Sequence, residues 1–94
     1  KPDLHDPGGY ENAQAMADEV LADIYTFQSV QGPAKRLLSG GVDWENLGPR
    51  NDREWQFFLN RHFHLLPLIK AYAQSPAPAY AAYVDATIQD WVGA

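Results

Sequence analysis

The segment from Arg53 to His64 carries side chains of the types that recognise polar ligands. Its apolar residues predict a helix, in which successive residues turn by about 100°. One sector of that helix, roughly 80° wide, then collects guanidinium, amide and imidazole groups; its members are Arg53, Gln56, Asn60 and His64. Because these groups stand where a solvated face would carry Lys and Glu, they indicate binding of a polar ligand. The alternative is structural: Asn60 and His64 bond to each other or to nearby backbone.

Two further side chains belong to this predicted binding site. Arg61 has a planar fork of donors that suits a carboxylate or a sulfate. It follows Glu54 by two helical turns, so the two side chains could form an orienting ion pair or a solvated pair that contributes little. Trp44 lies in the loop before the helix, and it is the best candidate for stacking against a sugar. Trp91, by contrast, falls on an apolar stripe and is expected in the core.

The pair His62 and His64 does not predict a metal site. Residues two apart on a helix diverge by about 200°, whereas metal-binding histidines on helices lie three or four apart. We expect His62 to pack in the core near Trp55. The sequence also lacks a Ser-His-Asp order, a Gly-rich phosphate loop and a close carboxylate pair. It therefore predicts no catalytic residue, no metal and no cofactor.

Helices are expected to position these side chains, and no strand is evident, which predicts an all-α fold. Residues 1–9 form an irregular lead-in with Pro and Gly. An amphipathic helix begins at about Tyr10, and its apolar stripe extends to Phe27. Residues 28–52 form a long loop rich in Gly and Pro, with a helical turn at 33–38.

Two more helices follow this loop. One begins at an N-cap, Asn51 or Asp52, and continues to about Ala73. Pro67 lies inside it and is expected to cause a kink, because proline lacks the backbone donor and clashes with the preceding turn. The last helix spans about residues 80–92, after a Pro-rich connection. Because that connection is short, the two helices should form an antiparallel hairpin.

Composition limits the classes of protein to which the chain can belong. Its 94 residues allow one domain, and 46% apolar with 20% charged residues is a globular balance. The absence of cysteine excludes disulfides and thiolate metal sites. No apolar run is long enough to span a membrane. The N-terminus lacks the pattern of a signal peptide, although one could have been removed from a longer precursor.

Charge points to the same part of the chain. The net charge is −5, yet residues 31–70 carry six Lys or Arg against four acidic residues, a balance of +2. This central segment is the only one suited to an anionic ligand. Nucleic acid is not an expected partner, because the chain lacks a dense basic stripe to neutralise phosphates.

The chain resembles the N-terminal part of the heparinase II/III family of polysaccharide lyases over about residues 13–92. The resemblance rests on short motifs along the chain: Asp43-Trp44, Arg53-Glu54-Trp55, Leu59-Asn60-Arg61-His62, Leu66, Ala71-Tyr72, Tyr80-Ala81 and Trp91-Val92. It implies helical hairpins of an incomplete (α/α) toroid, with 1–94 a single segment of a larger domain. Pro67 and the connection at 75–78 depart from the family's usual pattern.

The resemblance also implies an activity. Such enzymes cleave uronic-acid-containing polysaccharides, heparan-type or alginate-like, by β-elimination, and a periplasmic or secreted location goes with it. The family's catalytic groups lie further along the chain than this sequence extends. The residues expected here line the wall of the cleft for an acidic polysaccharide: Asn60, Arg61, His64, Trp44, Gln56 and Arg53.

The alternative hypothesis is a non-enzymatic α-helical interaction module. Apolar helix faces left exposed would then bind a partner protein, or would pair two copies of the chain as a homodimer.

Overall fold

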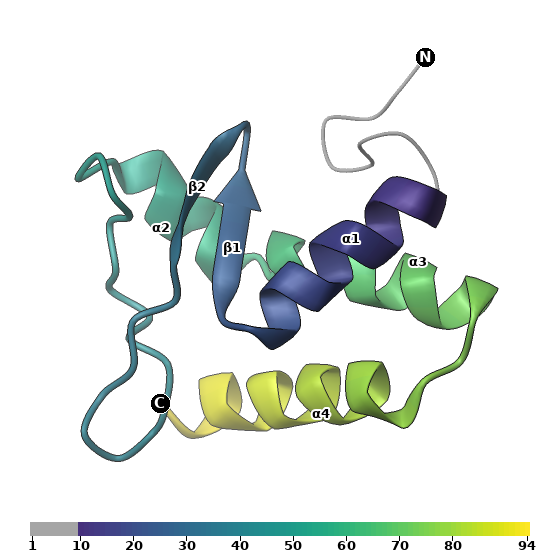
Figure 1. Cartoon of the computed structure of the whole chain (residues 1–94). Helices are drawn as coiled ribbons and strands as arrows, with labels where there is room; N and C mark the ends of the chain where they lie inside the picture. Colours follow the sequence, from purple (N-terminus) through teal and green to yellow (C-terminus); the bar gives the residue numbers. More distant parts are fainter. Residues whose placement is uncertain (1–9) are drawn as a thin grey trace.

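The computed structural model describes residues 10–94, and it shows a mixed fold of helices and one small sheet (Figure 1). The elements in order are α1 (Tyr10–Leu21), β1 (Ile24–Phe27), β2 (Val30–Pro33), α2 (Arg53–Asn60), the 3-10 helix η1 (Phe63–Leu65), α3 (Leu66–Gln74) and α4 (Pro78–Gly93). The prediction of an all-α fold was therefore wrong. The strands β1 and β2 pair in a two-stranded antiparallel sheet.

This β-hairpin replaces the end of the predicted first helix. Helix α1 stops at Leu21, and Asp23 takes a left-handed conformation with a φ of 62°. From there Tyr25 and Phe27 point into the core while Ile24 is 36% exposed, which is the period of two that a strand has. Ile24 and Phe27 are also three residues apart, so they had fitted a helical stripe equally well. Burial of Tyr25 decides for the strand.

The long loop is more ordered than the sequence indicated. Pro33 ends β2, and Arg36 pairs with Val42 in an antiparallel bridge, so the helical turn predicted at 33–38 does not form. Gly40 supplies the tip of this small turn with a φ of 92°, a conformation that glycine adopts without strain. The remainder of the loop then leads to Asp52.

Of the two predicted N-caps, Asn51 and Asp52, the structure has Asp52 as the N-cap of α2. Its side chain accepts a hydrogen bond from the Glu54 backbone N–H at 2.9 Å. The helix does not continue to Ala73, however. It ends at Asn60, and His62 has a φ of 63°, so the chain breaks where only a kink was expected. Pro67 then lies in the first turn of α3, where a backbone N–H would have no helical partner, so its absence costs no hydrogen bond.

The core lies where the helices α1, α3 and α4 meet the hairpin and α2. Its buried members are Ala17, Val20, Tyr25, Phe27, Trp55, Leu59, Leu65, Leu68, Ala71 and Tyr80. Helix α4 runs antiparallel to α3 along one side of the molecule, which confirms the predicted hairpin of the last two helices (Figure 1). Among residues 10–94, no helix is long and apolar enough to cross a membrane.

Candidate functional site

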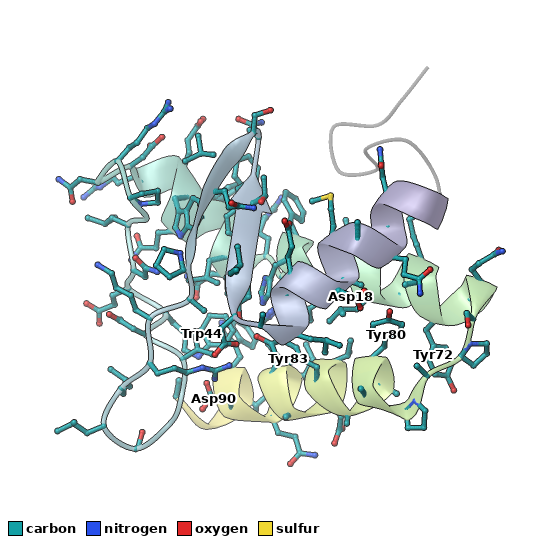
Figure 2. All side chains as sticks on the ribbon, in the orientation of Figure 1. Asp18, Trp44, Tyr72, Tyr80, Tyr83 and Asp90 are labelled. Carbon is teal, nitrogen blue, oxygen red and sulfur yellow. The ribbon has the colours of Figure 1, made fainter. Side chains whose placement is uncertain are left out.

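The loop that carries Trp44 is fixed to the last turns of α4 by one carboxylate. Asp90 Oδ2 accepts hydrogen bonds from the Val42 backbone N–H at 3.0 Å and from Trp44 Nε1 at 2.9 Å. Figure 2 shows Trp44 and Asp90 together at this end of α4. The indole of Trp44 is therefore half-buried and held in place, and its N–H group already donates to Asp90.

Asn60 joins the same loop to α2 and α4. Its Nδ2 donates to the backbone carbonyls of Trp44 at 2.8 Å and of Gln56 at 2.9 Å. Its Oδ1 accepts from Trp91 Nε1 at 3.1 Å. Both amide hydrogens and one oxygen lone pair are thus spent on the protein itself. Asn60 thus has the structural role that the sequence left open as the alternative to ligand binding, but its partners are Trp44, Gln56 and Trp91 rather than His64. We call Trp44, Asn60, Asp90 and Trp91 the loop junction.

The two histidines lie next to the loop junction. His62 meets Trp44 and Trp91 edge to face, with ring centroids 5.5 and 5.0 Å away, rather than packing beside Trp55 as predicted. His64 is 2% exposed and lies 4.4 Å from the Tyr25 ring. Burial lowers the pKa of His62, and burial with the nearby His62 and Arg36 charges lowers the pKa of His64 to about 3.

Neither histidine is arranged as a ligand in this state. The ring nitrogens of His62 and His64 are buried and have no hydrogen-bond partner among the described residues. Within residues 10–94, no three His, Asp or Glu side chains converge in a way that could hold a metal ion. The break at His62 removes His64 from the helix face that the sequence had given it, so it no longer lines up with Arg53 and Gln56.

A second group of side chains lies exposed along α2. Arg53, Phe57 and Arg61 follow each other at four-residue spacing, which places them on one edge of the helix. Phe57 is 53% exposed, and the Arg61 guanidinium carbon lies 4.7 Å from its ring centroid, a cation–π contact. Arg61 therefore packs on Phe57, and the ion pair considered with Glu54 does not form. We call Arg53, Phe57 and Arg61 the α2 basic edge.

Comparison with protein families identifies the family of the chain. The sequence profile of the heparinase II/III N-terminus matches residues 9–94. The chain belongs to the heparinase II/III family. This confirms the resemblance seen in the motifs around Trp44, Asn60 and Trp91. Comparisons with curated proteins and with solved structures give no match.

In this heparinase II/III chain, the predicted site residues separate into two sets. Trp44, Asn60 and His64 lie inward, where their polar groups are bonded or buried. Arg53 and Arg61 lie exposed, and Gln56 is half-buried between the sets. Substrate binding by any of them stays a prediction. The geometry shows only which side chains keep free polar groups for it.

The sequence did not reveal a polar cluster that connects the hairpin, the loop and α4. The hydroxyls of Tyr25 and Tyr83 are 2.6 Å apart, and Tyr83 donates to Asp23 Oδ1 at 2.7 Å. Arg36 donates two hydrogen bonds to the same carboxylate, from Nη2 to Oδ1 at 2.8 Å and from Nε to Oδ2 at 3.1 Å. Asp23 and Tyr83 are 60 residues apart in the chain, so no local spacing could have signalled this contact.

The ionisation of this cluster indicates a structural role. Burial raises the pKa of Tyr25, and burial together with the hydrogen bonds from Tyr25 and to Asp23 raises the pKa of Tyr83. Burial acts to raise the pKa of Asp23, but the hydrogen bonds from Arg36 and Tyr83 outweigh it and lower that pKa. A tyrosine with a raised pKa is a poor general base near neutral pH. We therefore assign no proton transfer to Tyr25 or Tyr83.

Proposed function

We propose that this chain is the N-terminal segment of a polysaccharide lyase that cleaves uronic-acid-containing polysaccharides by β-elimination. The proposal rests above all on the family match over residues 9–94. In it, the segment supplies wall residues of the substrate cleft, and the catalytic groups come from elsewhere in the full-length protein.

The chemistry explains this division of labour. β-Elimination needs a group that neutralises the uronate carboxylate, so that the neighbouring C5 proton becomes acidic, and a base that removes that proton. Among the described residues, Tyr25 and Tyr83 have raised pKa values and bond to each other, and His64 is buried. These three groups do not make a working base, and the proposal gives the segment a role in binding.

The α2 basic edge supports an acidic sugar chain as the bound species. Arg53 and Arg61 are exposed, and neither forms an ion pair within residues 10–94. Guanidinium groups match carboxylates and sulfates with two parallel hydrogen bonds. Phe57 lies between them with half of its surface exposed, which offers an apolar face to a sugar ring. Both arginines also lie in the one segment of the chain with a positive balance.

The test is product formation by the full-length protein. Alginate and heparan-type glycosaminoglycans are supplied separately, and the ultraviolet absorbance of unsaturated uronate ends is followed over time. We expect absorbance to grow on at least one of these polymers and to stay flat on a neutral glucan. If no uronate polymer gives product, the proposed function is wrong.

The alternative, an interaction module without activity, is favoured by one observation. A groove of about 370 Å³ lies between α3 and α4, with apolar lining that includes Ile69, Tyr72 and Ile88. These side chains are 54%, 43% and 38% exposed, so they could also pair two copies of the chain. Sedimentation of the 94-residue chain tests this. A dimer that Ile69→Asp converts to monomer would support pairing of two copies through this groove, and a monomer at every concentration would contradict that pairing.

A further inference from the structure

A second, chemically different cavity lies beside α1 and the hairpin. It has a volume of about 220 Å³ and is bordered by α1, the hairpin, α2, η1 and the first turn of α3. Its apolar walls come from three phenyl rings and four aliphatic or thioether side chains. These are Phe27, Phe58, Phe63, Met16, Val20, Ile24 and Pro67. The cavity is largely apolar and partly open, and it is smaller than the roughly 300–1,000 Å³ of a drug-sized ligand site, so its size fits a ligand of about one ring.

One carboxylate supplies the charge of this cavity. Among residues 10–94, Glu19 is the only acidic residue that lines it, and no Lys or Arg does. The Glu19 Oε2 atom accepts a hydrogen bond from Gln31 Nε2 at 3.2 Å, and the same Nε2 lies 3.4 Å from Thr26 Oγ1. The hairpin thus restrains the carboxylate from one side. Its Oε1 atom has no partner among the described residues and remains available to a donor.

The remaining titratable group in the wall does not offset this negative charge. His64 also lines the cavity, but it is 2% exposed, and burial lowers its pKa to about 3. Its ring is therefore neutral at pH 7. The electrostatic character of the cavity is that of Glu19, so an anion such as a uronate is disfavoured here.

We propose that this cavity binds a small organic amine. The apolar body of the ligand packs against Phe27, Phe58 and Phe63, and its ammonium group donates to Glu19 Oε1. This site is separate from the α2 basic edge and from the proposed lyase activity, because its charge preference is opposite. The apolar walls beside the half-buried Glu19 strengthen an ion pair relative to open water, which is why a single carboxylate can set the selectivity.

Three probes with the same ring and different charges test this assignment. Benzylamine is a cation at pH 7, benzyl alcohol is neutral and benzoate is an anion. Binding of each to the 94-residue chain is measured by NMR chemical-shift titration. We expect benzylamine to bind at least about tenfold more tightly than benzyl alcohol, a difference of about 1.4 kcal/mol. Benzoate should bind most weakly, with shifts confined to residues of the cavity wall for all three.

Glu19→Gln is the decisive variant, because it keeps the shape and an acceptor for Gln31 while it removes the charge. It should reduce benzylamine binding to the level of benzyl alcohol and leave benzyl alcohol unchanged. Glu45→Gln removes the same charge from an exposed position outside the cavity and should change neither.

Several outcomes would overturn the assignment. Equal affinity of the unmodified chain for the three probes would show that the cavity is apolar and does not distinguish ligands by charge. Tighter binding of benzoate, or no saturable binding of benzylamine, would exclude an amine site. The comparison of probes does not depend on a variant, so it still decides if Glu19→Gln fails to fold.

Discussion

Asn60 and Arg61 are neighbours in the chain, yet the structure gives them opposite surroundings. Asn60 belongs to the loop junction and makes three hydrogen bonds, to Trp44, Gln56 and Trp91. Arg61 belongs to the α2 basic edge and is exposed, with its guanidinium over Phe57. The comparison teaches that polar residues of one motif need not share a role. The segments that pack against the helix decide which of them stay available to a ligand.

The loop junction is the region where a single truncation should change stability most. Asn60→Ala removes three hydrogen bonds and leaves the Trp91 N–H and the Trp44 carbonyl without their partner. We expect the free energy of unfolding to fall by about 3 kcal/mol, since each lost bond of this kind contributes about 1 kcal/mol. Urea denaturation of the 94-residue chain measures this.

Gln56→Ala is the matched control for that change. It truncates a half-buried amide on the same helix, whose side chain makes none of the junction bonds, so it should lower the free energy of unfolding by less than about 1 kcal/mol. Equal losses for the two variants would contradict the special role of Asn60.

The pH dependence of stability should come mainly from the buried His64, which lies close to the loop junction. The folded pKa of His64, about 3, lies below the ordinary value of 6.5, so the folded state resists protonation. This contribution to stability is complete above pH 6.5 and is lost as pH falls toward 3. Between pH 7.5 and pH 5 the free energy of unfolding should drop by about 2 kcal/mol.

Thermal or urea unfolding across pH 5–7.5 checks this prediction. The His64→Phe variant removes the titrating group but keeps a ring in the core, and it should lose most of the slope. A small slope of the same sign should remain, because burial also lowers the pKa of His62. A slope that survives unchanged in the variant would assign the titration to other groups.

Truncation in the cluster of Tyr25, Tyr83, Asp23 and Arg36 should have an intermediate effect on stability. Tyr83→Phe removes the hydroxyl that bonds to Tyr25 and Asp23, while the ion pair of Asp23 with Arg36 remains. We expect a loss of about 1–2 kcal/mol in the free energy of unfolding. Tyr72→Phe, at a 43% exposed position, should change it by less than about 0.5 kcal/mol. Identical melts for the two variants would show that the cluster contributes nothing.

The sequence predicted those parts of the molecule whose signals are local. The start and end of the last helix and the Asp52 cap depend on residues within a few positions of each other. The expected burial of Trp91 was wrong, because that side chain is 43% exposed, and the chain breaks at His62 where only a kink at Pro67 was expected. The positive balance of residues 31–70 likewise needed no contact information.

The rest depended on contacts between distant segments. Ile24 and Phe27 satisfy a helical and an extended pattern alike, and only the burial of Tyr25 beneath α4 and His64 favours the strand. The Asn60 amide was visible in the sequence, but its partners Trp44 and Trp91 were not. The left-handed residue His62, which breaks the helix, has only a weak signal in its side-chain type, because histidine is enriched in this conformation but mostly occurs outside it.

The α2 basic edge should be the least sensitive region in stability. Arg53→Ala and Arg61→Ala remove exposed side chains and should each lower the free energy of unfolding by less than about 0.5 kcal/mol. The cation–π contact of Arg61 with Phe57 is exposed, so its loss should be small as well. A stability loss as large as that of Asn60→Ala would make this edge structural and would erase the contrast between the two regions.

Turnover by the full-length protein tests the central claim most directly. The double variant Arg53→Ala with Arg61→Ala is compared with Arg50→Ala, which removes an exposed arginine outside the edge. Formation of unsaturated uronate product is measured per folded molecule on the polymer that the unmodified protein cleaves. We predict that the double variant loses at least about tenfold in kcat/KM, since a charge-assisted bond contributes about 1.5–3 kcal/mol, while its melting temperature and the activity of Arg50→Ala stay unchanged. Full turnover in the double variant would contradict the assignment of this edge to the substrate.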